Sequence, residues 1–351
     1  MKMTKIYALT DYKNQFGSKW KSHPYRSGFD KTLLSKYFEK YGYEVEFIQL
    51  KDVEFEKSFW EGRVAIYTSS EDVGLNYKSY IEDIVFGLER LGAKVVPAYD
   101  FLRANNNKIY MEILREQLLG EKLSGNKSSY YGTLEELMVD VENEKIAYPC
   151  VIKKSAGAMS RGVFLAKNKM ELIKYAKAIS RSPHYLAELK ELVRKKKHDG
   201  YKAESKYQHK FIIQPFIPKL KNDWKILVYG DHYYILKRGI KSNDFRASGS
   251  HHNYKAGSQS EFPVDLLDDV EQIYNKLDIP HLSLDFAYDG SSHYVHEIQA
   301  VHFGTSTIEL CEDYFTKDSN NKWIAEKKQF DQEEEYVRGL VKYFERHPEL
   351  F

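Results

Sequence analysis

The sequence predicts an α/β (α+β) fold with more than one domain. In the first hundred residues, short apolar runs alternate with amphipathic segments, which is typical of a parallel sheet with helices between its strands. Further along the chain, two pairs of longer apolar runs enclose Gly-Asp or Asp-Gly turns, which indicates β-hairpins. With 351 residues, the chain is long enough for two or three domains with sizeable cores.

The composition excludes several classes of protein. The 28 Tyr and 19 Phe exclude a disordered chain, and a net charge of +2 gives no general case for a nucleic-acid or membrane partner. The two cysteines, Cys150 and Cys311, cannot form a disulfide framework or a metal site with Cys spacing, so a reducing, cytoplasmic location is expected. No signal-peptide core follows Met1, and no apolar run approaches the ~18 residues of a membrane span.

The first domain is expected to span residues 1–105. Its apolar runs and helical periodicity predict strands at 6–10, 45–48, 64–67 and 94–97, and helices near 33–38 and 81–91. A parallel sheet of this kind binds ligands at the carboxyl ends of its strands.

The second region, residues 106–215, is predicted to begin with a helix that Asn105, Asn106 and Asn107 cap. Lys108 lies in the first turn of this helix, where a cation opposes the helix dipole. Residues 120–133 are expected to form a loop, and Thr133 to cap a second helix. Strands are predicted at 150–153, 163–166 and 211–217, with a helix near 170–178.

A basic helical insertion is expected near residues 181–210, which carry nine Lys or Arg. A solvated helix face is the commoner explanation of such a run, and a patch for an acidic partner is the alternative.

The third region, residues 216–351, follows a hinge-like connection between Pro215 and Pro218. A polar loop at 242–250 carries Arg246. The remaining predicted elements are a hairpin at 223–229 and 232–238, a helix at 265–277, and a hairpin at 281–288 and 294–299.

The first candidate for chemistry is the loop that follows Lys153. This lysine ends a short apolar strand, and small residues follow it between Gly157 and Gly162. Backbone N–H groups of such a loop can cradle phosphate oxygens while the ammonium neutralises their charge. A Walker A site is rejected because Val163 stands where Gly-Lys-Ser/Thr should continue. The alternative is an ordinary hairpin with a surface lysine.

The second candidate is the hairpin that carries Asp285, Glu297 and Gln299. Glu297 and Gln299 are two residues apart and therefore share a face of their strand. Asp285 joins that face if the connecting loop has an odd number of residues, such as 289–291, and lies opposite if the loop has two. Clustered oxygen ligands of this kind suit Mg²⁺. The alternative is an edge hairpin with a solvated polar face.

Taken in order, these segments resemble the ATP-grasp family across roughly residues 1–310. The resemblance is greatest to glutathione synthetases and ribosomal-protein glutamate ligases. It rests on the order of six motifs: Asn107-Lys108, Pro149-Cys150-Val151-Ile152-Lys153 with its loop, Gln214-Pro215-Phe216-Ile217, Asp223-Trp224-Lys225, Asp244-Phe245-Arg246, and Asp285 with Glu297-Ile298-Gln299-Ala300.

The resemblance implies an ATP-grasp fold preceded by a Rossmann-like domain, with ATP and Mg²⁺, as two ions, for cofactors. It implies that Lys225 and Arg246 are catalytic, Arg246 by stabilising charge on the transferring phosphoryl group. It implies nucleotide contacts from Lys108, Lys153, Gly157, Ser160, Gly162, Gln214, Pro215, Phe216 and Ile217, and metal ligation by Asp285, Glu297 and Gln299.

Three residues depart from the family pattern. Lys225 replaces the usual arginine, so a planar two-pronged contact becomes a point charge. Pro215 stands where an acidic residue often follows the glutamine, and Gln299 replaces the usual asparagine.

The implied activity is an ATP- and Mg²⁺-dependent carboxylate–amine, or carboxylate–thiol, ligase that acts through an acyl phosphate. Its partners are expected to be small-molecule substrates, with neither a membrane nor nucleic acid among them, and a dimer is compatible with the sequence. Two alternatives remain open: a kinase of the same fold that phosphorylates a hydroxyl group, and a nucleotide-binding module without turnover.

Overall fold

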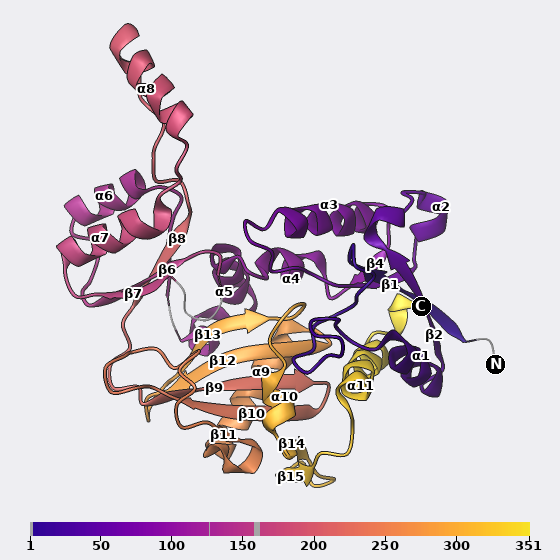
Figure 1. The fold of residues 1–351 in the computed structure, drawn as a ribbon. Helices are drawn as coiled ribbons and strands as arrows, with labels where there is room; N and C mark the ends of the chain where they lie inside the picture. Colours follow the sequence, from indigo (N-terminus) through magenta and orange to yellow (C-terminus); the bar gives the residue numbers. More distant parts are fainter. Residues whose placement is uncertain (1–2, 126, 158–161) are drawn as a thin grey trace.

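The computed structural model describes residues 3–125, 127–157 and 162–351, which form three β-sheets that follow one another along the chain (Figure 1). Within these residues, no helix is both long enough and apolar enough to cross a membrane.

The first sheet is parallel, as the alternation of strands and helices predicts, with strand order β2-β1-β3-β4. Apolar side chains fill both of its faces: Ile6 and Val64 lie on one side, and Leu9 and Leu88 on the other. The elements are β1 (Thr4–Thr10), α1 (Lys31–Lys40), β2 (Tyr43–Gln49), α2 (Lys57–Trp60), β3 (Val64–Tyr67), α3 (Asn76–Arg90), β4 (Lys94–Val96) and α4 (Tyr99–Ala104).

A helix from the far end of the chain completes the core of this sheet. Helix α11 (Gln332–Arg346) packs Leu340 and Phe344 into the same cluster as Ile6. Its buried Glu333 accepts a hydrogen bond from the Lys19 ammonium at 2.7 Å. No helix or strand after residue 299 is predicted from the sequence, so this long-range contribution of α11 was not foreseen.

The second sheet is small and antiparallel, with strand order β5-β8-β6-β7. Thr133 caps α6 in a capping box with Glu136, which confirms the predicted helix start. The loop predicted at 120–133 is partly wrong, because a second helical segment follows a kink at the non-helical Gly120 (φ 70°) and a strand begins at Ser129. The elements are β5 (Ser129–Tyr131), α6 (Leu134–Glu142), β6 (Cys150–Lys154), β7 (Val163–Ala166), α7 (Lys169–Ser180), α8 (Tyr185–Lys197) and β8 (Phe211–Pro215).

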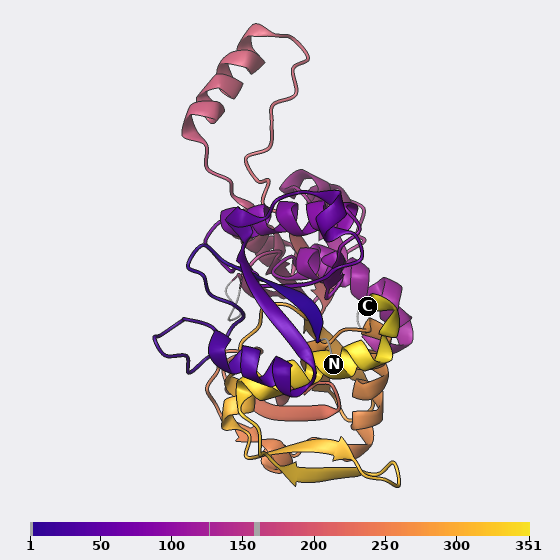
Figure 2. The same cartoon turned by 90° about the vertical axis from the view of Figure 1, so that its right-hand side faces the viewer.

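Helix α8 stands apart from the rest of the molecule. It lies on an arm that leaves the second sheet after α7 and returns to β8 (Figures 1 and 2). None of its residues is buried, in agreement with a helix in the basic insertion.

The third sheet is the largest and is antiparallel, with β13-β12-β9-β10-β14-β15 in order and β11 paired to β10. Both predicted hairpins lie in it. Its elements are α5 (Lys108–Ser124), β9 (Asn222–Tyr229), β10 (His232–Gly239), β11 (Lys255–Ala256), α9 (Leu267–Leu277), β12 (His281–Tyr288), β13 (His293–Gln299), α10 (Ser306–Leu310), β14 (Asp313–Lys317) and β15 (Trp323–Lys327). Short 3₁₀ turns span Leu50–Asp52, Gly257–Ser260, Val264–Leu266 and Pro348–Leu350.

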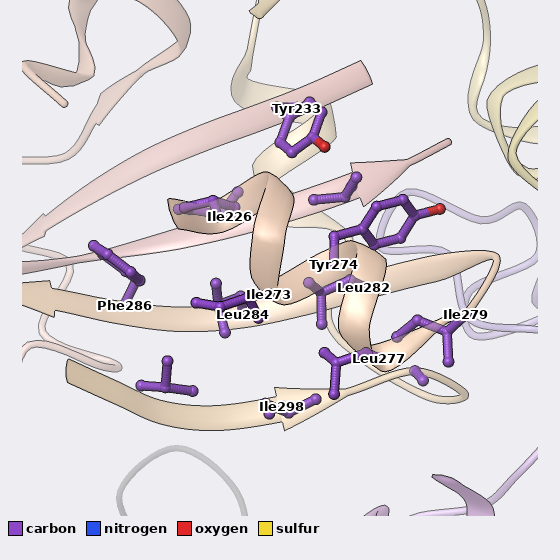
Figure 3. Packing of buried hydrophobic residues seen from close by; sticks show 14 of the residues in the cluster. Ile226, Tyr233, Ile273, Tyr274, Leu277, Ile279, Leu282, Leu284, Phe286 and Ile298 are labelled. Atoms are coloured by element: carbon purple, nitrogen blue, oxygen red, sulfur yellow. The ribbon is translucent and has the colours of Figure 1, made fainter. Parts of the chain in front are cut away.

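The two faces of this sheet differ in chemistry. On one face, Ile226, Leu284 and Ile298 pack against α9 residues such as Ile273, and α5 covers the same cluster (Figure 3). Because side chains alternate along each strand, the neighbours Asp223, Lys225 and Asp285 belong to the opposite face. Burial of the apolar face therefore presents a row of charged side chains on the other.

A β-bulge determines which face of the sheet Asp285 and Glu297 occupy. The β12–β13 loop has four residues, 289–292, and not the three or two considered from the sequence. An even loop would pair Asp285 with His296. Instead, Phe286 pairs with Val295 and Asp285 pairs with Glu297, which leaves His296 as the extra residue. The bulge therefore places both carboxylates on one face.

His281 should make the fold sensitive to acid. Its buried Nε2 donates to the Tyr336 carbonyl at 2.8 Å, and burial lowers its pKa to about 3. Between pH about 6.5 and about 3, the unfolded state binds a proton at this imidazole and the folded state does not. The free energy of unfolding therefore falls as the pH falls through this range, by up to about 1.4 kcal/mol per pH unit for one group.

We expect urea unfolding of the His281→Gln variant between pH 7 and 4 to show a shallower loss of stability than the wild type. Burial also lowers the pKa of His296 to about 3, so the variant should still lose some stability as the pH falls. The exposed His198→Gln variant is the control. An unchanged slope in His281→Gln would show that this imidazole is not responsible.

Candidate functional site

A cleft of about 1000 Å³, its open mouth included, lies between the second and third sheets. Its walls come from β6, β7 and β8 on one side and from β9, β12 and β13 on the other, with the first residue of α5 and the loop after β10. A space of this size suits a nucleotide. The predicted site residues that line it are Lys108, Lys153, Gly157, Gln214, Pro215, Phe216, Ile217, Arg246, Asp285 and Glu297.

Lys153 enters the cleft because of the alternation along β6. Cys150 and Ile152 fill the core of the second sheet, so Val151 and Lys153 point to the other side and line the cleft. Burial lowers the pKa of Lys153, and the charge of Glu112 opposes this shift. A phosphate oxygen bound here would form a charge-assisted hydrogen bond with this partly desolvated ammonium and stabilise its charged form.

The start of α5 is tied to the loop after Lys153. The Lys108 backbone N–H donates to Ser155 O at 2.9 Å, and its ammonium donates to Gly157 O at 3.1 Å. Gly157 N–H in turn donates to Asn106 Oδ1 at 2.8 Å. The two lysines that the sequence places 45 positions apart therefore lie in one cleft.

Of the other predicted residues of the phosphate loop, Gly162 is described by the structure and Ser160 is not. Gly162 O accepts from Lys154 N at 2.9 Å, which closes the loop, but Gly162 is not among the residues that line the cleft. Ser160 lies outside the described residues.

The predicted adenine segment lies at the end of β8. Gln214 is buried, and its amide donates to Ser128 Oγ at 2.8 Å. Phe216 N–H donates to Pro149 O at 3.4 Å. All four residues from Gln214 to Ile217 line the cleft, so a ring system bound here would meet both side chains and backbone of this connection.

The carboxylates of the second hairpin face each other in the cleft. Glu297 Oε1 lies 3.4 Å from the Lys108 ammonium. Buried Asp285 Oδ1 has no hydrogen-bond partner among the described residues, although the Lys225 ammonium lies 3.6 Å away. Gln299 is two pairs further along, opposite Ser283, and does not line the cleft.

Arg238 is the functional candidate that the sequence reasoning missed. Its guanidinium donates to both Asp223 oxygens, at 2.7 and 2.8 Å, and lies 3.0 Å from Asp285 Oδ2. Burial raises the pKa of Asp223, whereas the charges of Arg238 and Lys225 outweigh burial at Asp285 and lower its pKa. Asp285 therefore stays ionised inside the protein.

The signal for Arg238 was present in the sequence. A two-residue Gly230-Asp231 turn pairs Tyr229 with His232, and the same register pairs Asp223 with Arg238. The neighbouring strand thus carries a planar cation beside Asp285, while Lys225 pairs with Asp285 from outside the cleft lining.

His296 also lines the cleft, and simple periodicity could not find it. Its Nδ1 atom is buried without a hydrogen-bond partner among the described residues. Burial and the charge of Lys153 lower its pKa to about 3, so the ring is neutral. A hint lay in Val295 and Ile298, which are both apolar yet three residues apart, a spacing that a regular strand cannot place on one face.

Arg246 lies at the rim of the cleft. Its Nε and Nη2 atoms donate to the two oxygens of Asp244, each at 2.9 Å, and its side chain is 38% exposed. The two partners are close in sequence and partly in water, so this pair contributes little to stability.

Asp285 and Glu297 fit a hard cation that takes few protein ligands. Among the described residues, no group of three His, Cys, Asp or Glu side chains is arranged to hold a metal unaided. Mg²⁺ commonly takes one or two carboxylates and completes its shell with substrate phosphates and water. Asp285 Oδ1, which accepts no hydrogen bond among the described residues and lies 3.6 Å from the Lys225 ammonium, is an acceptor of the required kind.

Removal of the buried cation should be costly. We expect Arg238→Met to lower the free energy of unfolding by about 3–5 kcal/mol, because Asp223 and Asp285 lose their main partner inside the protein. Chemical denaturation of the wild type and of Arg238→Met would measure this difference in the free energy of unfolding.

The matched control is Arg246→Met, which removes an arginine from an exposed two-pronged pair and should cost at most about 1 kcal/mol. If the two variants lost similar stability, Arg238 would not be the cation that holds these strands together.

No family model matches the chain, and a comparison with curated proteins gives no match either. Solved structures do match. The D-Ala:D-Ser ligase VanG of Enterococcus faecalis is 13% identical with a TM-score of 0.54, and the match covers 97% of this chain and 99% of that one. The D-cycloserine synthetase DcsG is 11% identical with a TM-score of 0.51, over 96% of this chain and 99% of that one.

Both matches span nearly the entire chain and therefore include all three sheets. At 11–13% identity they establish the architecture and leave the chemistry to be argued from the residues. The resemblance seen in the order of the motifs and the likeness of the three-sheet arrangement agree: the chain has the ATP-grasp fold.

Proposed function

We propose that the protein is an ATP- and Mg²⁺-dependent ligase that joins a carboxylate to an amine through an acyl phosphate. The observation that carries the proposal is the convergence of Lys108, Lys153, Asp285 and Glu297, from three separate parts of the chain, in one cleft. Two cations and two carboxylates around one space match the needs of a nucleoside triphosphate and its metal.

In this proposal the nucleotide lies between the two sheets. Its ring contacts the connection from Gln214 to Ile217, and its phosphates extend toward Lys153 and Lys108. The Lys108 ammonium now contacts Glu297 and Gly157 O, so it is already held at the phosphate end of the cleft.

Asp285 and Glu297 would hold Mg²⁺; Gln299, the third ligand that the family resemblance implies, shares their face of the sheet but lies outside the cleft lining and is left out of this proposal. The ion would supply positive charge against the phosphates and the transferring group. Arg238 holds Asp285 in its ionised form, the form that a cation requires.

The chain's own groups serve two steps. A substrate carboxylate oxygen attacks the γ-phosphorus of ATP, the bond to the bridging oxygen breaks, and ADP leaves. An amine then attacks the acyl carbon and expels phosphate with loss of a proton. The cations Lys153 and Arg246 offset the charge that develops, and the cleft between the sheets limits water that would hydrolyse the acyl phosphate.

The two compared enzymes support small-molecule substrates, since they are named a D-Ala:D-Ser ligase and a D-cycloserine synthetase. A thiol in place of the amine, or a hydroxyl as phosphoryl acceptor, would use the same nucleotide site.

The test is ATP turnover with pooled carboxylates and amines in the presence of Mg²⁺. A ligase releases ADP and phosphate and yields a product lighter by one water than the sum of its substrates. Hydroxylamine in place of the amine should trap the acyl phosphate as a hydroxamate. A stable phosphorylated product without condensation would instead identify a kinase, and ATP binding without any turnover would identify a binding module.

Glu297→Gln tests the metal assignment. We expect Mg²⁺-dependent turnover to fall by orders of magnitude, because the charge that neutralises the phosphates is held less well. In thermal melting, Mg²⁺-ATP should stabilise the wild type more than ATP alone, as mass action requires of a ligand of the folded state.

That additional Mg²⁺ stabilisation should shrink in Glu297→Gln and remain in Glu61→Gln, which alters a surface carboxylate of the first sheet's domain. Full retention in Glu297→Gln would place the metal elsewhere.

Arg246→Lys tests the role of the rim arginine. Turnover should fall more than ATP affinity, because the contact with the transferring group forms mainly in the transition state. Steady-state kinetics and a nucleotide titration measure the two effects. Normal turnover combined with lost ATP affinity would assign Arg246 to nucleotide binding instead.

A further inference from the structure

The arm between α7 and β8 carries a surface that the proposed activity does not use. Residues 181–210 contain nine Lys or Arg and four Asp or Glu, a local excess that the overall charge of +2 conceals. Helix α8 projects with this arm away from the cleft and the other two sheets (Figures 1 and 2).

One side of α8 is apolar from Tyr185 to Val193, and Lys196 lies on the same side in the last turn. Its five large apolar side chains are between 60 and 77% exposed, far more than most such residues in a folded protein. With 3.6 residues per turn, they fall within an arc of roughly 120°, as in an amphipathic helix. They are Tyr185, Leu186, Leu189, Leu192 and Val193.

The acidic side chains of α8, which lie outside the apolar arc, already pair with other residues of the arm. Glu188 pairs with Arg181 and Lys206, and Glu191 accepts from the Tyr201 hydroxyl at 2.8 Å. These contacts hold the helix against the returning chain. They account for its formation despite a length at which an isolated helix is marginal in water, and they leave the apolar side open.

Basic side chains border the apolar arc on its other edge. Lys190, Arg194 and Lys197 follow one another on that flank by helical spacing, and Arg194 also pairs with Glu191 at 2.6 Å. An apolar strip beside a row of cations is the pattern of helices that lie in the surface of an anionic bilayer, where the apolar side chains enter the acyl boundary and the cations meet the headgroups.

We propose that α8 docks the protein on an anionic lipid surface. Among the described residues, no helix or strand lies beside α8, and only the returning segment of the arm runs near it (Figures 1 and 2). The five apolar side chains are each at least 60% exposed, so the strip from Tyr185 to Val193 is open. A flat anionic surface matches both the shape and the charge of this face.

A second copy of the chain fits this face less well. Two α8 helices packed antiparallel about a twofold axis would place each basic flank beside the same flank of the partner, and the like charges would repel. A parallel pair would need the flank of Glu188 and Glu191, which residues 201–206 of the same chain already contact.

Vesicle flotation of the full-length protein, without nucleotide, tests the proposal. We expect binding to vesicles of phosphatidylcholine and phosphatidylglycerol in equal amounts, and at least tenfold weaker binding to phosphatidylcholine alone, since each cation near such a surface changes affinity by about fivefold. High salt should weaken the binding.

The variant Leu189→Glu/Val193→Glu should bind at least tenfold more weakly while keeping the wild-type melting temperature, because no α8 residue is buried. The control Val73→Glu/Met170→Glu adds the same charges at apolar side chains that are 99 and 83% exposed elsewhere, and should bind as the wild type does.

Three outcomes would overturn the proposal. Absence of binding by the folded wild type would point to an acidic protein groove as the occupant. Equal binding by the α8 variant would place the contact elsewhere. Self-association in light scattering that the α8 variant loses would assign the face to a second copy. None of these outcomes depends on turnover, so the proposed function stands or falls separately.

Discussion

The cleft depends on one buried ionic contact, the Arg238 guanidinium between Asp223 and Asp285. Two carboxylates on adjacent strands repel each other and lose hydration on burial, so neither strand could keep its charge there without a cation. Arg238 answers both needs because its planar fork binds Asp223 at two points and still reaches Asp285. The same contact keeps Asp285 ionised, as a metal ligand must be, and the other oxygen of Asp285 accepts no hydrogen bond among the described residues.

The third sheet contributes to the apolar core on one face and to the polar cleft on the other. Val295 and Ile298 belong to the core beneath α5 and α9, whereas Glu297 lines the cleft. In a regular strand Val295 and Glu297 would share a face, so the bulge at His296 is what allows both placements. His296 then enters the cleft as a buried, neutral imidazole with an unpartnered nitrogen. The geometry of the site and the packing of the core therefore depend on the same irregularity.

The chain brings together segments that are far apart in sequence. Helix α11 joins the first sheet to the third, since Leu340 packs with Ile6 while Glu335 accepts from the Tyr234 hydroxyl. Lys108 at the start of α5 connects the loop of the second sheet to Glu297 of the third. The arm that carries α8 takes part in neither connection, so its sequence is free to serve contacts outside the molecule.

By itself, the sequence determined the parallel first sheet, both hairpins and the types of most elements up to residue 299. These follow from local rules: apolar periodicity, turn chemistry and side chains that alternate along a strand. The order of the motifs, through the family resemblance, indicated ten of the residues that line the cleft. Tertiary structure decided the partner of Asp285, the face of Glu297, the distance of Gln299 from the cleft and the place of α11. Each of these depends on register between strands or on packing between segments far apart in the sequence, and local periodicity gives at most a hint of it, as the spacing of Val295 and Ile298 does for the bulge. Arg238 lies between the two cases, because a two-residue turn implies its pairing with Asp223, but only the assembled sheet brings it to Asp285.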